Sequence, residues 1–261
     1  MDKELFTICE HHLDSGLRGY PIGYCITSSV DPEKGVFYRG YPISDIFDKE
    51  VEEVIFLLEQ GNLPSKGELI EFKKQLSFHS KIPHVVKEAI DDLPKVGHPM
   101  KTYAIAVLIL GMHIGTGDLK KDLLNLQAML PELTALVING SFGWGKTPSS
   151  KPELGYVQNF CQMLQCATVK NRELFQLFIN IFINLHMDHG GGNLSMFTAK
   201  AVASGHEDLF GSFAAALLAL SGPRHGKANQ DGLEFVAKIY KDLGAFPTNE
   251  RVKRYVETLL E

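Results

Sequence analysis

The sequence predicts an all-α, multi-helical protein with one small β-hairpin near its start. Two observations carry this prediction. Almost every apolar segment after residue 50 has helical period, and the only strong turn signal between two short extended segments lies before residue 40. The chain has 261 residues, of which 44% are hydrophobic and 22% are charged, which is an ordinary composition for a globular protein with a sizeable core.

The hairpin comes first along the chain. Two extended segments, Tyr20–Thr27 and Val36–Arg39, flank the pentapeptide DPEKG. Aspartate and proline commonly begin a turn and glycine commonly ends one, so the two segments are expected to pair as antiparallel strands.

Helices are expected from residue 51 onward. Segment 51–61 carries an apolar face and ends at Gly61, and segment 65–76 begins at Ser65, which can cap it. Segment 97–117 is apolar nearly all round, so it is expected to be deeply buried or to lie in a subunit interface. A helix over 118–130 leads to Pro131, which can begin the next helix. Further helices are expected at 153–167, 171–188, 194–204, 208–220, 228–243 and 249–260.

Charge and composition argue against several classes of partner. The net charge of −5 leaves no basic footprint for nucleic acid or an anionic membrane, and the apolar runs at 104–112 and 213–220 are too short to span a bilayer. The first residues lack the apolar core of a signal peptide. The four cysteines have neither disulfide-framework nor zinc spacing, which favours a reducing cytoplasm. We therefore expect a cytoplasmic location without nucleic-acid or membrane partners.

The stretch GSFGWGKT at 140–147 matches the phosphate-binding loop pattern of nucleotide hydrolases. That loop needs a strand before it and a helix directly after it. Residues 133–138 could form a strand or the end of a helix, but Pro148 and Pro152 lie where the helix should begin. We expect a surface loop between helices and discard the nucleotide interpretation.

A first candidate site is LHMDHGGGN, residues 185–193. His186 and His189 are three residues apart and can share a helix face. Three interpretations are open: a metal site with further ligands from elsewhere, a helix end with one buried histidine, or an anion-binding pocket in which His189 is a donor. The three consecutive glycines exceed what a helix end needs and favour a functional role.

A second candidate site is SGPRHGKANQDG, residues 221–232. Gly222 and Pro223 end one helix and another begins shortly afterwards, which places His225 near a helix N-terminus. The helix dipole there disfavours the imidazolium ion, and a neutral histidine can donate a hydrogen bond to a carbonyl during proton abstraction. The alternative is a histidine that only caps the following helix.

Together these two motifs resemble the citrate synthase family, whose runs LHxDHxGGN and GPLHGxAN appear here as LHMDHGGGN and GPRHGKAN. The stretches GLRGYPI, VFYRGYPI, LLEQGNLPSKGEL, HPM (98–100) and LGYVQNFCQML also match, in family order. The resemblance covers essentially the whole chain. It implies an all-helical homodimer that condenses acetyl-CoA with oxaloacetate to citrate and CoA, with acetyl-CoA as a substrate and no cofactor or metal. It also implies a large domain at 1–224 and the start of a small domain at 225–261.

The motif match implies a role for four residues. His225 would be the catalytic histidine that stabilises the enol of acetyl-CoA. His189 and Asn193 would lie at the oxaloacetate pocket, with His186 as a supporting neighbour.

The sequence departs from the family pattern in one respect. The family's second catalytic histidine, its aspartate base and further substrate arginines come later than the last helix found here, and none of the six arginines lies in such a motif. Arg224 and Lys227 add positive charge beside His225. The last helix also has no C-terminal cap, so we expect a chain cut within a larger architecture.

Two functional expectations follow from that departure. In the first, the chain is inactive alone or needs a second polypeptide to complete the small domain, and the keto acid it accepts stays open. In the second, it is a non-catalytic relative that serves in binding or oligomerisation.

Overall fold

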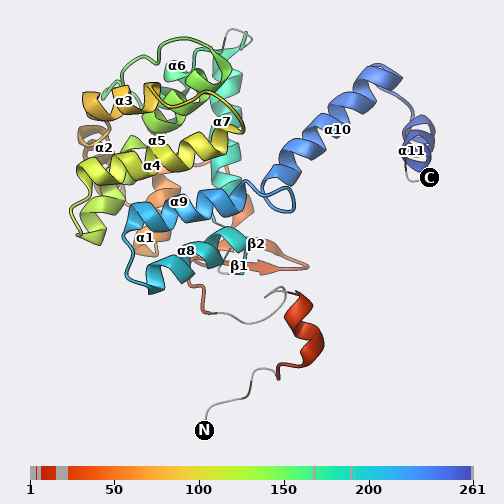
Figure 1. Cartoon of the computed structure of the whole chain (residues 1–261), viewed down its shortest axis with the longest axis horizontal. Helices are drawn as coiled ribbons and strands as arrows, with labels where there is room; N and C mark the ends of the chain where they lie inside the picture. The colour runs from red at the N-terminus through yellow and green to blue at the C-terminus, as the bar shows by residue number, and fades with distance from the viewer. Residues whose placement is uncertain are drawn as a thin grey trace.

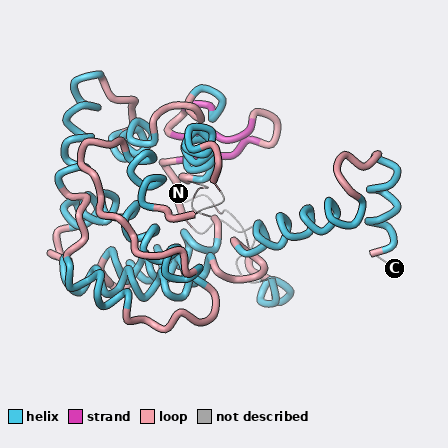
Figure 2. The backbone as a smooth tube through the Cα atoms, turned by 90° about the horizontal axis from the view of Figure 1, so that it is seen from above, coloured by secondary structure: helices cyan, strands magenta, loops and turns pink. Residues whose placement is uncertain are grey.

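The computed structural model describes residues 4, 7–15, 23–166, 169–188, 190 and 192–259. Within these residues the chain forms eleven α-helices, three short β-strands in one antiparallel sheet and two 3-10 helices. Most helices pack into one body, whereas α10 and α11 project from it (Figures 1 and 2). The predicted fold class, all-α with a small β element, is confirmed. In the described part of the chain, no helix combines the length and apolarity needed to span a bilayer.

The elements follow one another in a simple order. They are η1 (Glu10–Ser15), β1 (Ser28–Asp31), β2 (Gly35–Tyr38), β3 (Tyr41–Pro42), η2 (Ile43–Asp45), α1 (Val51–Gln60), α2 (Lys66–Phe78), α3 (His84–Asp91), α4 (Pro99–Ile114), α5 (Leu119–Phe142), α6 (Tyr156–Met163), α7 (Arg172–His186), α8 (Leu194–Ser204), α9 (Leu209–Leu220), α10 (Lys227–Leu243) and α11 (Asn249–Thr258).

The hairpin forms around the predicted turn, but its first strand is shifted. β1 begins at Ser28, and residues 23–27 of the strand predicted at Tyr20–Thr27 are not in a strand; the earlier ones lie outside the described residues. The Asp31 side chain accepts hydrogen bonds at 2.9 Å from the N–H groups of Glu33 and Lys34. This tightens the turn, so pairing starts directly beside it at Asp31 and Gly35. The short β3 was not predicted.

The helices α1 and α2 form where the sequence predicts them, and α3 was missed. α2 begins with a capping box in which the N–H of Ser65 donates to the carboxylate of Glu68 at 2.8 Å. α3 buries Val86 and Ile90, which lie four residues apart on one face. That spacing could have predicted a short helix in this segment between two prolines.

The predicted helix break at Pro131 is wrong, because α5, which is 24 residues long, continues through it. Proline has no N–H, so the carbonyl of Gln127, four residues earlier, loses its helical partner. The hydroxyl of Tyr156 in α6 donates to that carbonyl at 2.9 Å. The helix therefore continues because a side chain from another helix supplies the missing hydrogen bond.

The course of α5 also decides whether the glycine-rich stretch at 140–147 can be a phosphate-binding loop. Residues 133–138 are helical, so no strand leads into the loop. Gly143 ends α5 with a left-handed conformation at φ 65°, and α6 begins only at Tyr156 instead of the predicted 153. A phosphate-binding loop requires a strand before the turn and a helix directly after it, so the nucleotide interpretation is excluded.

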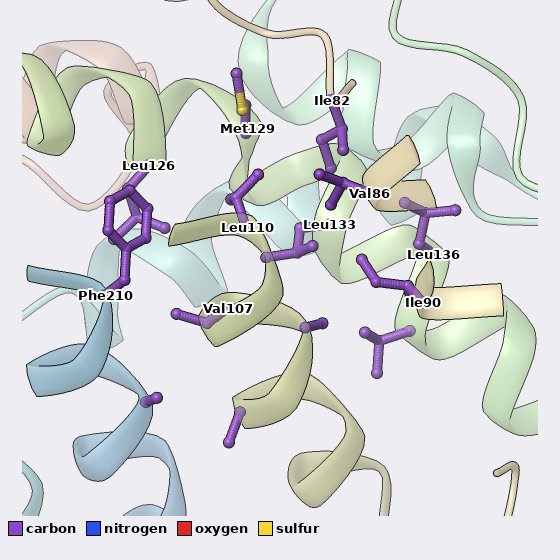
Figure 3. Packing of buried hydrophobic residues seen from close by; sticks show 14 of the residues in the cluster. Ile82, Val86, Ile90, Val107, Leu110, Leu126, Met129, Leu133, Leu136 and Phe210 are labelled. Carbon is purple, nitrogen blue, oxygen red and sulfur yellow. The ribbon is translucent and has the colours of Figure 1, made fainter. Parts of the chain in front are cut away.

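The largest apolar cluster lies where α3, α4, α5 and α9 meet (Figure 3). Val107 and Leu110 from α4 and Leu133 from α5 are fully buried there, and Phe210 reaches in from α9. A Cβ atom at Gly111 would lie only 2.5 Å from Cβ of Phe210, so this glycine lets α4 and α9 approach closely.

We expect Gly111→Ala to destabilise the fold by about 1–3 kcal/mol, the usual cost of overpacking a core. The added methyl group would push against Phe210, which is itself only 1% exposed. Urea unfolding monitored by circular dichroism measures the effect. Gly67→Ala in α2 is the matched control, because no atom lies within 4 Å of its Cβ position, and it should stabilise the helix by about 0.5–1 kcal/mol. Equal effects at both positions would contradict the close-approach argument.

Candidate functional site

The second motif forms a tight turn between α9 and α10. The N–H of Gly226 donates to the carbonyl of Leu220 at 2.9 Å, and the N–H of His225 donates to Gly222 at 3.0 Å. A Cβ atom at Gly226 would lie 2.5 Å from Cδ1 of Leu220 and 2.6 Å from its carbonyl oxygen. The turn therefore requires glycine, and it places His225 directly before the first residues of α10, the location that the sequence predicts.

The imidazole of His225 is held by a serine from another helix. Its Nε2 lies 2.6 Å from the hydroxyl of Ser195, the second residue of α8. The ring is half-buried, and among the described residues Nδ1 has no hydrogen-bond partner. Sequence reasoning missed Ser195, because the contact depends on the packing of α8 against α9 and not on any local spacing.

The first motif forms a loop that is hydrogen-bonded within itself. Asn193 caps α8: its Oδ1 accepts from Met196 N–H at 2.9 Å and its Nδ2 donates to the carbonyl of Gly190 at 3.0 Å. Asp188 accepts from Gly190 N–H at 2.8 Å, and Gly190 has the left-handed φ of 78°. Asn193 thus fixes the start of the helix that carries Ser195.

The two histidines of the first motif differ in what the structure shows. His186 ends α7, is exposed, donates from Nδ1 to the carbonyl of Phe182 at 2.7 Å and stacks on that ring at 4.3 Å. His189 lies outside the described residues. Across the described ranges, no three His, Cys, Asp or Glu side chains gather as a metal-binding group. No described contact joins His186 to His225.

The β-hairpin contacts the loop that follows α7. The N–H of Asp188 donates to the hydroxyl of Tyr38 at 3.3 Å, and Tyr38 is fully buried. Burial, with the Asp188 charge acting in the same sense, raises the pKa of Tyr38. A Cβ atom at Gly190 would lie 3.4 Å from Oγ of Ser28 and 3.8 Å from Sγ of Cys25. The loop therefore rests on the first residues of the sheet.

Cys25 is expected to react with iodoacetamide at neutral pH. Burial alone would raise its pKa, but hydrogen bonds from Thr27 and Ser28 together outweigh burial and lower the pKa to about 7. Its thiolate therefore increases as the pH rises through about 7, and the alkylation rate should level off above it. Burial raises the pKa of Cys161 to about 11, which makes it the internal control.

Mass spectrometry of timed samples measures both cysteines in one experiment. Parallel pH profiles for Cys25 and Cys161 would contradict this prediction.

Two cations lie beside His225, in different settings. Arg224 is exposed. Lys227 forms an ion pair with Asp231 of the same helix at 3.0 Å. The structure thus brings His225 and Ser195 together, places Asn193 at the start of the same α8, and leaves His186 at the end of α7.

The chain is similar in sequence to known proteins over most of its length. The family profile "Citrate synthase, C-terminal domain" matches residues 16–261. Citrate synthase 4, mitochondrial, of Arabidopsis thaliana is 34% identical over 92% of this chain and 55% of its own length. The mitochondrial 2-methylcitrate synthase of Yarrowia lipolytica is 31% identical over 92% of this chain and 57% of its own length. The chain thus spans little more than half of these relatives. Because both are named mitochondrial, the predicted cytoplasmic location gains no support.

The fold is similar to that of a solved enzyme. The crystal structure of citrate synthase from Thermotoga maritima superposes with a TM-score of 0.78 at 26% sequence identity, covering 95% of this chain and 64% of that one. The family profile and the sequence relatives name the same family that the sequence motifs resemble. The chain belongs to the citrate synthase family.

Proposed function

We propose that this chain supplies part of the active site for the condensation of acetyl-CoA with oxaloacetate to citrate and CoA. The observation that carries the proposal is His225: it lies at the N-terminus of α10, Ser195 holds its Nε2 at 2.6 Å, and its Nδ1 has no partner in the described part of the chain. The named activities of the relatives support the same reaction.

The geometry suits stabilisation of an enolate by a neutral imidazole. If the Ser195 hydroxyl donates to Nε2, the ring carries its proton on Nδ1 and can donate it as a hydrogen bond to the thioester oxygen. Negative charge develops on that oxygen as a base removes a methyl proton, and the positive end of the α10 dipole favours it. The nucleophilic carbon then bonds to the keto carbon of oxaloacetate as the thioester carbonyl re-forms; the electron pair of the keto C=O bond moves to its oxygen, which takes up a proton. Water then cleaves the thioester to release CoA.

Oxaloacetate would lie near the loop that follows α7. His189 and Asn193 are the residues we propose for this pocket, with His186 beside them. Both amide atoms of Asn193 bond within the chain, so its proposed part is to hold the loop around His189. Arg224 is an exposed cation beside His225, where it could contact a substrate carboxylate.

We further propose that residues 1–224 form a large domain and that 225–261 begin a small domain completed by further polypeptide. No residue of α10 or α11 is buried in this structure. α10 exposes large apolar side chains, with Leu233 71%, Val236 60% and Tyr240 61% exposed. The chain spans 55% of the Arabidopsis enzyme, which leaves enough sequence in that relative to cover such surfaces.

A complementation assay tests the proposed function. The purified chain should release no free CoA from acetyl-CoA and oxaloacetate. Adding the part of the Arabidopsis enzyme that the match leaves uncovered should restore release, detected with a thiol reagent. The assay is repeated with propionyl-CoA, whose condensation with oxaloacetate gives 2-methylcitrate. Turnover by the chain alone would disprove the incomplete site, and failure of every supplement would favour the non-catalytic alternative.

We also propose that the chain forms a homodimer through α4. One face of α4 is buried in the main cluster, but Ile105, Leu108 and Met112 form an outward stripe and are 44%, 43% and 85% exposed. Leu108→Glu should turn a dimer into a monomer in sedimentation experiments, because it places a charge in an apolar contact. Val85→Glu on α3, at a position 52% exposed, is the control and should leave the dimer intact. A wild-type chain that sediments as a monomer would exclude the interface.

A further inference from the structure

Helix α10 has few attachments to the body from which it projects (Figures 1 and 2). None of its residues is buried. Within the described residues, two side-chain hydrogen bonds leave it. One joins Asp242 to Tyr255 of α11, and the other joins Gln230 to His98 at the start of α4. Beyond the turn that holds His225, His98 is therefore the side chain that ties α10 to the helical body.

The hydrogen bonds around His98 form a consistent chain. Its Nδ1 accepts from the N–H of Met100 at 3.3 Å and so caps α4. Nδ1 is then unprotonated, and Nε2–H of the neutral ring donates to Oε1 of Gln230 at 3.2 Å. The amide nitrogen of Gln230 donates in turn to Glu234 at 2.8 Å. Every donor meets an acceptor, which fixes the orientation of the Gln230 amide.

In the described part of the chain, no other polar side chain in the first turns of α10 makes a hydrogen bond or ion pair with the helical body. Lys227 pairs with Asp231, four residues along the same helix. Gln230 lies five residues after His225, so a bond at Gln230 acts close to the turn that carries the catalytic candidate. A change in the tilt of α10 would shift that turn relative to α8 and hence His225 relative to Ser195.

We propose that His98 is a positioning residue: by bonding Gln230 it sets the direction of α10 and keeps His225 in register with Ser195. The effect of His98 on catalysis rests on the proposed function, whereas its effect on the direction of α10 does not. It assigns a role to the histidine of the HPM stretch that lies outside both histidine motifs.

Spin-label distance measurements on the whole chain test the structural part. Nitroxides on keto-amino acids at the exposed positions Lys120 and Lys238 report the direction of α10 and leave the native cysteines untouched. Gln230→Leu removes the acceptor and should lower the population at the wild-type distance about two- to tenfold, as expected for one lost hydrogen bond. The double variant Gln230→Glu with Glu234→Gln keeps both hydrogen bonds and the net charge. It should restore the population at the wild-type distance. Unchanged distances in Gln230→Leu would overturn the proposal.

Kinetics of the complemented enzyme test the catalytic part. Gln230→Leu should lower kcat about two- to tenfold with little change in KM, because the misplaced group acts in the transition state. The exchange variant should recover kcat, which a general loss of stability would not predict. If the distances respond but the complemented wild type shows no condensation, the proposed function fails while the positioning role stands. If condensation is present and kcat does not respond, His98 does not position His225.

Discussion

His225→Ala is expected to lower kcat of the complemented enzyme about 100- to 1000-fold, the usual cost of losing one donor to a developing oxyanion. The remaining site would still bind substrate, so KM should change much less. Ser195→Ala should cause a smaller loss, because the imidazole stays but loses the partner that lies 2.6 Å from its Nε2. CoA release under saturating substrates measures both variants.

A histidine far from the site provides the control. His84 lies on α3, is exposed, and pairs with Glu88 at 3.2 Å. His84→Ala should leave kcat unchanged. If His225→Ala keeps activity within about twofold of the wild type, the loss expected for an oxyanion donor is missing and the catalytic assignment is wrong.

Glu132→Leu is expected to lower the free energy of unfolding by about 3–5 kcal/mol, the cost of breaking a buried ion pair from one side. Glu132 is 1% exposed and accepts from Lys87, from the N–H of Ile82 at 2.9 Å and from the N–H of Ser150 at 3.4 Å. Lys87 lies in α3, Ile82 in the segment before α3, and Ser150 in the segment before α6. Leucine would leave all of them without an acceptor.

Urea unfolding with two further variants locates the cause of that loss. Glu132→Gln keeps an acceptor oxygen and should be less damaging than leucine. Glu257→Gln alters an exposed pair with Lys253 at 3.8 Å on α11 and should change stability by less than about 0.5 kcal/mol. A loss at Glu132 as small as that at Glu257 would show that the buried acceptor is unimportant.

The sequence was sufficient where structure depends on neighbouring residues. The start of α2 follows from Ser65 and Glu68, three residues apart, and the end of α1 from Gly61. The position of His225 follows from the helix break at Gly222 and Pro223, because a turn there leaves little choice about where α10 begins. These features are local, so the pattern of residue types contains them.

The sequence was insufficient where a structural feature depends on a residue far away along the chain. Continuation of α5 through Pro131 depends on Tyr156, 25 residues later, and no local rule contains that contact. The contact of Ser195 with His225 spans 30 residues and depends on how α8 lies against α9. The same holds for His98 and Gln230, which are 132 residues apart.

The bond between Tyr156 and Gln127 also sets an order of assembly. An interior proline costs a helix about 3 kcal/mol, so before α6 docks the residues on either side of Pro131 behave as two short helices joined at a weak point. The loop over residues 143–155 has to close first, because it brings Tyr156 to the exposed carbonyl. The longest helix among the described residues therefore becomes one continuous element late in folding, and its far half is stabilised by a loop that carries no chemistry of its own.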